Sequence, residues 1–178
     1  MPRRENFMKH VATKTTYLEM LAAPEDAVEP PREDLSVSRK VRPTVEEYLY
    51  LYNSVGRDYQ WIDRNLMAPD ELEVILRNEL IEVHELSVGD RAAGFAELDR
   101  RRDQQVELAY FGLFPEFIGQ GIGKYFLQWV VERAWSYQPR RVWVHTCDLD
   151  HPAALSNYQR AGFQIYDEQI IQQVVKET

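Results

Sequence analysis

The chain has 178 residues, of which 44% are hydrophobic and 28% are charged, and its formal net charge is −8. This composition indicates one ordinary globular domain over residues 1–178 and excludes a disordered chain. The negative charge argues against nucleic acid as the main partner, because a phosphate backbone demands a positive surface. No apolar stretch approaches the roughly 18 residues of a membrane span, and the first ten residues lack the apolar run of a signal peptide. We therefore expect a cytoplasmic protein with no membrane partner.

The first predicted elements are two strands, Val11 to Leu21 and Leu35 to Arg42. Residues 1–10 form a possible flexible arm, and residues 22–34, which are rich in proline and acidic side chains, form a loop between the strands or the boundary of a flexible tail.

Two helices are expected next. Thr44 and Glu47 have the spacing of a capping box, so a helix begins there and runs to about Val55, where Gly56 stops it. A second helix begins after Ala68-Pro69-Asp70 and carries the sequence LEVILRNEL.

A strand meander follows these helices. The segments IEVHELSV and AAGFAELD flank Gly89-Asp90, which predicts a β-hairpin in which His84 is exposed or half-buried. QVELAYFGL predicts a further strand, apolar on both faces except for Glu107.

Apolar residues at helical spacing then predict an amphipathic helix from Ile122 to about Tyr137. The next strand, RVWVHTC, contains the only cysteine, Cys147, which we expect as a small core residue rather than a reactive thiol. His151-Pro152 opens a short helix that Gly162 closes, and FQIYDEQIIQQVV adds one or two strands. This order of elements predicts a mixed α/β fold.

Three glycines, Gly119, Gly121 and Gly123, lie between a strand and a helix N-terminus. Backbone N–H groups and the helix dipole make such a junction an anion site, although the same glycines also suit a plain tight turn. Ile118 breaks the pattern of a P-loop and Lys124 breaks that of a dinucleotide-binding loop.

This arrangement resembles the cofactor loop of the GNAT superfamily, the acyl-CoA-dependent N-acetyltransferases. The family pattern is Gln or Arg, two residues, Gly, one residue, and Gly or Ala. Gly121 and Gly123 match it, whereas Ile118 stands where Gln or Arg belongs.

A second segment, HPAALSNYQRAGF, resembles the other conserved region of the family. Tyr158, Gly162 and Phe163 match, whereas His151 stands where the family usually has Asn. The two segments occur in the family's order and together cover roughly the last half of the chain.

The resemblance implies a GNAT-like fold, a central mixed, mostly antiparallel sheet flanked by helices. It also implies direct transfer of an acetyl group from acetyl-CoA to a primary amine, without a covalent enzyme intermediate or a metal. In this family, backbone amides of the glycine loop bind the pyrophosphate, and the pantetheine arm lies along the preceding strand. The implied cofactor-binding residues are Phe111, Gly112, Leu113, Gly119, Gln120, Gly121, Ile122, Gly123, Lys124 and Asn157. Lys124 could contact a phosphate, although a lysine in the first turn of a helix is more often simply solvated.

The resemblance also assigns catalytic residues. Tyr158 matches the tyrosine near the leaving sulfur, which makes it the expected general acid, although its spacing also suits an aromatic on the core face of a short helix. Glu107 is the candidate base, acting through water. Alternatively, Glu107 reaches solvent or a cross-strand partner such as Arg100 or Arg141.

Glu97 and Asp148, near strand ends, are reserve candidates for the base, and an exposed amine needs none if enough of it is neutral. His145 and His151 lack a third ligand at metal spacing, so we expect no metal site.

The acceptor amine is expected near the connection between the early helices. Tyr59 and Trp61, with Asp58 and Asp63, form a candidate aromatic and acidic cleft for a cationic amine, small or peptide-borne, although such aromatics also commonly pack onto a core. Two other readings remain open: a non-catalytic acyl-CoA-binding sensor or interaction module on the same fold, and a purely structural protein. The final strand or the N-terminal arm could pair two chains into a homodimer.

Overall fold

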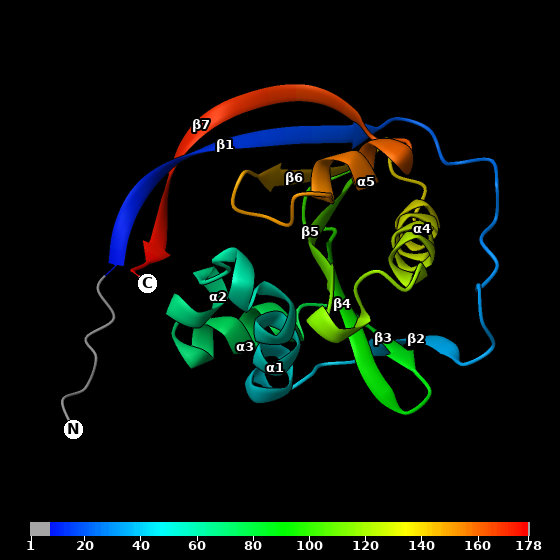
Figure 1. The fold of residues 1–178 in the computed structure, drawn as a ribbon, viewed down its shortest axis with the longest axis horizontal. Coiled ribbons are helices and arrows are strands. Elements are labelled where there is room, and N and C mark those ends of the chain that lie inside the picture. The colour runs from blue at the N-terminus through cyan, green and yellow to red at the C-terminus, as the bar shows by residue number, and fades with distance from the viewer. Residues whose placement is uncertain (1–7, 178) are drawn as a thin grey trace.

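The computed structural model describes residues 8–177, which form one seven-stranded sheet (Figure 1). Its strands are β1 (Met8–Met20), β2 (Leu35–Lys40), β3 (Ile81–Val88), β4 (Arg91–Asp99), β5 (Gln105–Leu113), β6 (Arg141–Cys147) and β7 (Gln164–Lys176). Their order is β2-β3-β4-β5-β6-β1-β7, and the neighbours are antiparallel except for β5 and β6, which run parallel. The mixed, mostly antiparallel sheet predicted from the sequence is confirmed.

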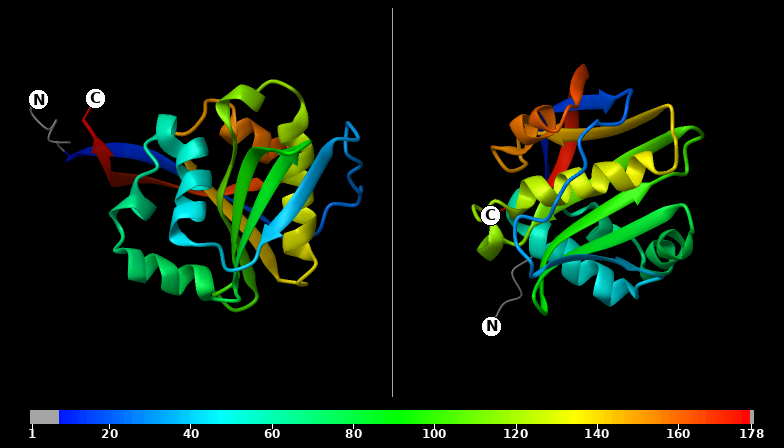
Figure 2. Two further views of the ribbon diagram at one scale, coloured as in Figure 1. Left: turned by 90° about the horizontal axis from the view of Figure 1, so that it is seen from below. Right: turned by 90° about the vertical axis from the view of Figure 1, so that its right-hand side faces the viewer.

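Helices cover both faces of this sheet (Figures 1 and 2). They are α1 (Val45–Gly56), α2 (Asp63–Leu66), α3 (Pro69–Arg77), α4 (Ile122–Trp135) and α5 (Ala154–Arg160). The helices α1 to α3 lie on one face, and α4 lies on the other with α5 near it. None of the helices in residues 8–177 is long and apolar enough to cross a membrane.

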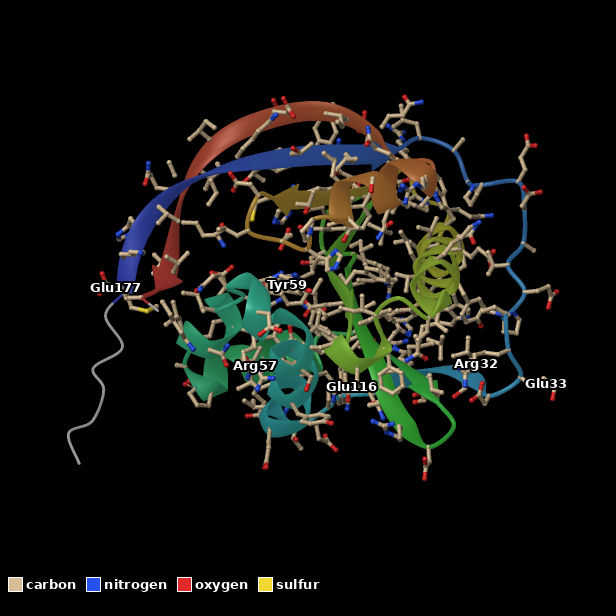
Figure 3. All side chains as sticks on the ribbon, in the orientation of Figure 1. Arg32, Glu33, Arg57, Tyr59, Glu116 and Glu177 are labelled. Carbon is tan, nitrogen blue, oxygen red and sulfur yellow. The ribbon has the colours of Figure 1, made fainter. Side chains whose placement is uncertain are left out.

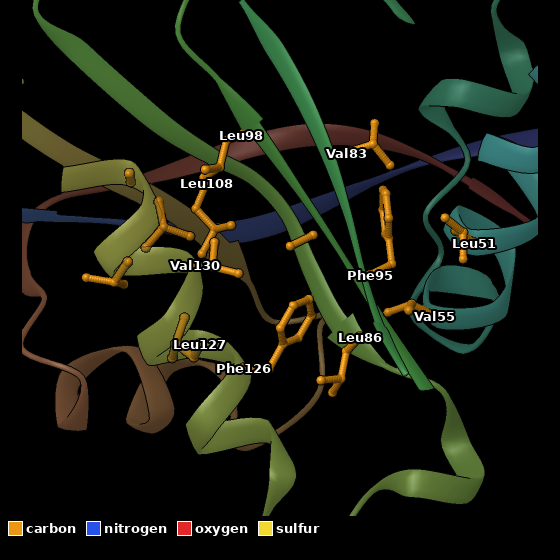
Figure 4. Packing of buried hydrophobic residues seen from close by; sticks show 14 of the residues in the cluster. Leu51, Val55, Val83, Leu86, Phe95, Leu98, Leu108, Phe126, Leu127 and Val130 are labelled. Atoms are coloured by element: carbon orange, nitrogen blue, oxygen red, sulfur yellow. The ribbon is translucent and has the colours of Figure 1, made fainter. Parts of the chain in front are cut away.

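The hydrophobic core has a layer on each face of the sheet (Figure 4). On one face, Phe126 and Val130 of α4 pack toward Leu108, and on the other Val55 of α1 packs toward Phe95. All five side chains are almost completely buried. Each contributes roughly 1.5–3 kcal/mol by leaving water, so these two layers fix α1 and α4 against the sheet.

The predicted start of α1 is confirmed and its end lies within one residue of the predicted Val55, but the role predicted for Gly56 is wrong. Thr44 and Glu47 form the capping box: the Thr44 backbone N–H donates to the Glu47 carboxylate at 2.8 Å, and the Glu47 backbone N–H donates to the Thr44 hydroxyl at 3.1 Å. Gly56 does not stop the helix; it is the last residue of α1 and has an ordinary φ of −88°. Glycine is required there because a Cβ would lie 2.4 Å from the side chain of Trp61. The chain turns instead at Gln60, where φ is +60°.

Helix α3 ends at Arg77, three residues before the end of the segment LEVILRNEL that was predicted to be helical. Asn78 is extended, and its side-chain oxygen accepts a hydrogen bond from the Leu80 backbone N–H at 2.9 Å. Asparagine commonly makes such a local bond in place of continuing a helix.

The strands β1 and β7 form a long antiparallel ribbon along one side of the molecule (Figure 1). Their pairing runs from Met8 opposite Lys176 to Glu19 opposite Gln164. Residues 8–10, part of the possible arm, therefore belong to the sheet, while residues 1–7 lie outside the described residues. The final segment is one strand, and β7 is an edge of the sheet.

A buried ionic cluster joins α4 to the sheet around Glu82 of β3. The Glu82 carboxylate accepts hydrogen bonds from Arg133, at 3.0 Å from each of two nitrogens, and from the Tyr137 hydroxyl. His84 Nε2 lies 2.9 Å from it, and Arg39 3.3 Å. The expected exposure of His84 is wrong, because α4 covers this face and leaves the histidine 1% exposed.

Candidate functional site

The site begins where β5 and β6 separate. Their parallel pairing covers only Gln105 to Glu107, although β5 continues to Leu113. A bulge also interrupts the β4–β5 pairing at Ala109, since Leu98 lies opposite Leu108 and Glu97 opposite Tyr110. Beyond Glu107, the β5 edge that faces β6 pairs with no strand within residues 8–177. The sheet is thus open in its middle.

A cavity of about 1220 Å³ occupies this opening and reaches both faces of the sheet. Twelve of the site residues expected from the sequence line its wall: Tyr59, Trp61, Glu107, Phe111, Gly112, Leu113, Gly119, Gly121, Gly123, Lys124, Asn157 and Tyr158. Gln120 and Ile122 lie beside this wall but do not line it. Ile122 is fully buried in the core, and the Gln120 side chain donates to the Glu116 carbonyl at 3.0 Å.

The glycine loop presents open backbone to the cavity. Gly119 and Gly121 have φ values of +83° and +75°, which L side chains rarely adopt, and a Cβ on either would meet no described atom within 4 Å. The loop is therefore glycine-rich because of its backbone conformation, and the space beside it is accessible.

This loop leads directly into α4. Gly121 is the N-cap residue, no described side chain caps the helix, and its first turn carries no acidic residue. Its first N–H groups and its dipole thus favour an anion, and Lys124, exposed in the first turn, adds a positive charge.

Gly112 serves a different purpose from the loop glycines. A Cβ at this position would lie 2.3 Å from Cγ1 of Val55, so the absence of a side chain lets β5 approach α1. Val55 and Gly112 both line the cavity. This close contact therefore belongs to the wall of the cavity.

Tyr158 lies in the wall on the α5 side. Its side chain is 7% exposed and packs edge-on against Phe111 and Phe163, with ring centroids 6.4 and 5.9 Å away. Burial raises the pKa of Tyr158, so its hydroxyl stays protonated at neutral pH and can donate a proton. Its position fits both readings of the sequence, a proton donor and an aromatic on the core face of α5.

Glu107 does not have the arginine partner considered from the sequence. The strand register places Arg141 beside Gln105, and Arg141 pairs with Glu19 at 2.7 Å. The Glu107 carboxylate instead lies 3.5 Å from Nδ1 of His145, which also lines the cavity.

The reserve base Glu97 is fully buried below the cavity wall. It forms an ion pair with Arg64 at 2.5 Å and accepts a hydrogen bond from the Tyr48 hydroxyl. Asp148 is exposed in a turn, and it does not line the cavity. The structure therefore leaves neither carboxylate facing the opening between β5 and β6.

The far end of the cavity is aromatic and acidic, as proposed for the acceptor. Trp61 Nε1 donates to Asp150 Oδ1 at 3.1 Å, which ties the early helices to the loop after β6. The Tyr59 ring lies 5.8 Å from that of His151 across the same boundary (Figure 3). Asp63 lines this end and Asp58 does not. Sequence reasoning missed Asp150; its place just after a buried strand, where site residues often lie, was the available signal.

Cys147 also lines the cavity, so the expected core position is wrong. It is half-buried because β6 ends there, and burial raises the pKa of its thiol. A thiol with a raised pKa is a poor nucleophile at neutral pH.

The comparisons with known proteins decide the family. The sequence pattern of the Acetyltransferase (GNAT) family matches residues 46–163, from α1 to the residue before β7. The chain belongs to this family. GNAT acetyltransferases use acetyl-CoA as the acyl donor. No curated protein matches the chain.

Solved structures share the GNAT fold with this chain. A GCN5-related N-acetyltransferase from Sphaerobacter thermophilus superposes with a TM-score of 0.67 at 13% identity, over 94% of this chain and 53% of that one. A putative GNAT acetyltransferase from Novosphingobium aromaticivorans has a TM-score of 0.64 at 14% identity, and the match covers 96% of this chain and 68% of that one. A Bacillus subtilis acetyltransferase, solved in complex with CoA, has a TM-score of 0.56 at 22% identity, and the match covers 75% of this chain and 78% of that one. The chain thus spans about half the length of the first of these.

The opening between β5 and β6 lies within the residues that the family pattern covers, and both polar and apolar side chains line it. Within residues 8–177, no group of three His, Cys, Asp or Glu side chains is placed to hold a metal ion.

Proposed function

We propose that this protein is a one-domain enzyme that transfers the acetyl group of acetyl-CoA to a primary amine by direct attack. The observation that carries the proposal is the cavity through the sheet. It joins an anion-binding helix N-terminus on one face to an aromatic and acidic pocket on the other. A donor and an acceptor entering from opposite sides would meet between β5 and β6.

The donor half of the cavity suits an acyl-CoA. The pyrophosphate would accept hydrogen bonds from the loop amides between Gly119 and Gly123, beside Lys124. The amide-bearing pantetheine arm would pair with the open backbone edge of Phe111 to Leu113 as an added strand does. Asn157 lines the wall facing this path and can donate to it.

The acceptor half suits a positively charged amine. Arg64 and Arg101 line the cavity but are neutralised by ion pairs with Glu97 and Asp99, at 2.5 and 2.7 Å. The electrostatic potential in this half is therefore negative, because it is set by the carboxylates of Asp63, Asp150 and Glu107. A cation can also contact the aromatic faces of Tyr59 and Trp61.

Within this arrangement, Tyr158 is the group that would protonate the leaving sulfur, because its hydroxyl carries a proton at neutral pH and its side chain lines the cavity beside Phe111. Glu107 takes part in the other proton transfer of the reaction, in which the ammonium group of the acceptor loses a proton. It lies on the acceptor side of the point where the strands part.

Calorimetric titration with acetyl-CoA and CoA tests donor binding. Gly121→Glu places bulk and negative charge in the proposed pyrophosphate site, and we expect it to abolish micromolar binding. Gly89→Glu is the matched control, because Gly89 also has a positive φ and open surroundings but lies in the β3–β4 turn. Equal loss of affinity in both variants, or no binding by the wild type, would reject the proposal.

Turnover is then measured with spermidine, tyramine, free lysine and a lysine-containing peptide. Tyr158→Phe should lower kcat by about 100-fold while keeping the affinity for CoA, since a general acid contributes roughly 10²–10⁴. Acetyl-CoA binding without acetylation of any amine would instead favour a sensor.

A further inference from the structure

We propose that His145 is the catalytic base, and that Glu107 is a positioning residue that holds its imidazole. The inference rests on the proposed function and assigns the proton-accepting group of that reaction. It starts from two side chains on neighbouring strands whose polar ends meet in the wall of the cavity. His145 Nδ1 and Glu107 Oε1 lie 3.5 Å apart at the point where β6 leaves β5.

The strand register explains why these two residues meet. Glu107 lies opposite Trp143, and His145 follows two residues later, so all three side chains point to the same face of the sheet. This is the face on which the aromatic and acidic acceptor pocket lies. The imidazole therefore stands between the end of the strand pairing and the acceptor.

Exposure decides which member of the pair meets the amine. The His145 side chain is 44% exposed, whereas that of Glu107 is 18% exposed. The carboxylate approaches Nδ1 of the ring, so Nε2 is the ring nitrogen that remains to meet the amine. A carboxylate in that place favours the tautomer with its proton on Nδ1 and leaves the Nε2 lone pair free to accept a proton.

Other groups hold the ring in this orientation. Tyr17 of β1 and Trp143 of β6 lie beside it, with ring centroids 5.8 and 6.2 Å away. The ionisable groups along this part of the wall are Glu107 from β5, Tyr17 from β1 and Cys147 from β6 itself, together with the ion pair of Asp99, which lies opposite Glu107 on β4, and Arg101. The 3.5 Å contact is longer than an ordinary hydrogen bond, as is common for catalytic pairs without substrate.

The proton balance of the reaction is complete with these residues. His145 Nε2 takes one proton from the acceptor ammonium and becomes an imidazolium, which the Glu107 carboxylate stabilises. The neutral nitrogen then bonds to the acetyl carbon, and the carbon–sulfur bond breaks. Tyr158 gives its proton to the sulfur and regains one from the new amide nitrogen. His145 finally releases its proton to water, so each turnover frees one proton and leaves the enzyme unchanged.

The test compares His145→Gln, Glu107→Gln and the double variant, with His10→Gln as the matched control. His10 is an exposed histidine of β1 that does not line the cavity. The rate is measured against pH with whichever amine of the panel reacts fastest, and acetyl-CoA affinity is measured by calorimetry.

We expect His145→Gln to lower kcat/KM for the amine by about 100-fold at neutral pH and to leave acetyl-CoA affinity unchanged. Its rate should keep rising with pH as the neutral fraction of the amine grows, so the deficit shrinks in alkaline buffer. Glu107→Gln should cost about tenfold, and the double variant should be no worse than His145→Gln, because groups acting as a unit are non-additive. Added imidazole should restore part of the turnover of His145→Ala.

Three results would overturn the assignment. The first is a His145→Gln rate within threefold of the wild type, and the second is a deficit that is equal at every pH. The third is a larger loss in Glu107→Gln than in His145→Gln, which would make the carboxylate itself the base. A wild type that binds no acetyl-CoA or acetylates no amine refutes the proposed function instead, and the assignment falls with it.

Discussion

The contact between Gly112 and Val55 makes the sharpest prediction about stability. An alanine at position 112 would place its Cβ 2.3 Å from Val55 Cγ1, which is about 1 Å closer than an ordinary carbon–carbon contact. Val55 is 2% exposed and belongs to the hydrophobic core, so a shift of its side chain disturbs the residues packed around it. We expect Gly112→Ala to lower the free energy of unfolding by about 1–3 kcal/mol, the usual cost of overpacking a core.

The second half of this prediction is a rescue. Val55→Ala removes the clashing methyl group and costs about 1–3 kcal/mol through the cavity it leaves. In the double variant the new Cβ occupies part of that space, so the two losses should not add. Urea titrations of the four proteins, followed by circular dichroism, give the coupling energy, which we expect to be about 1 kcal/mol or more. Losses that add to within about 0.5 kcal/mol would show that this contact does not set the distance between α1 and β5.

Two further predictions concern polar contacts. Glu82→Gln should destabilise the protein by about 3–5 kcal/mol at neutral pH, because it leaves Arg133 and its neighbours without their buried carboxylate. Burial alone would raise the pKa of Glu82, but hydrogen bonds from His84, Arg133 and Tyr137 outweigh this effect and hold the pKa below its ordinary value. Its contribution is therefore present above the unfolded-chain pKa of about 4.3 and is lost as pH falls further. Urea midpoints at pH 7 and pH 4 should show the difference between the two proteins shrinking in acid; a growing difference would contradict this. Trp61→Phe, which removes the bond to Asp150, should cost about 0.5–1.5 kcal/mol by thermal unfolding, and an unchanged midpoint would mean that the bond contributes nothing.

The parts of the fold that the sequence predicts are those that depend on neighbouring residues. The capping box of Thr44 and Glu47 is local, and so is the turn at Gly162, where φ is +107°. Gly56 shows the limit of this reasoning. A glycine near a helix end usually marks a stop, but here it is needed because Trp61 folds back onto it. That contact exists only once the chain after α1 has packed.

The site divides in the same way. The glycine loop lines the cavity wall, and its place between the end of β5 and the start of α4 follows from local sequence, whereas Tyr158 reaches the same wall from α5. The pairing of Glu107 with His145 could not be predicted, since it depends on the register between β5 and β6. The burial of His84 was missed for a similar reason, because only the packed α4 covers it.

The position of β1 has a consequence for how the protein is made. β1 leaves the ribosome before the other six strands of this sheet, yet its hydrogen-bonding partners β6 and β7 are the last two of the seven, since Met20 pairs with Val142 and Met8 with Lys176. During synthesis β1 therefore exposes both of its backbone edges while β2 to β5 can already pair with one another. Closing so long a loop is slow, and unpaired edges invite aggregation. We therefore expect β1 to dock between β6 and β7 late in folding, once both of these strands have been synthesised.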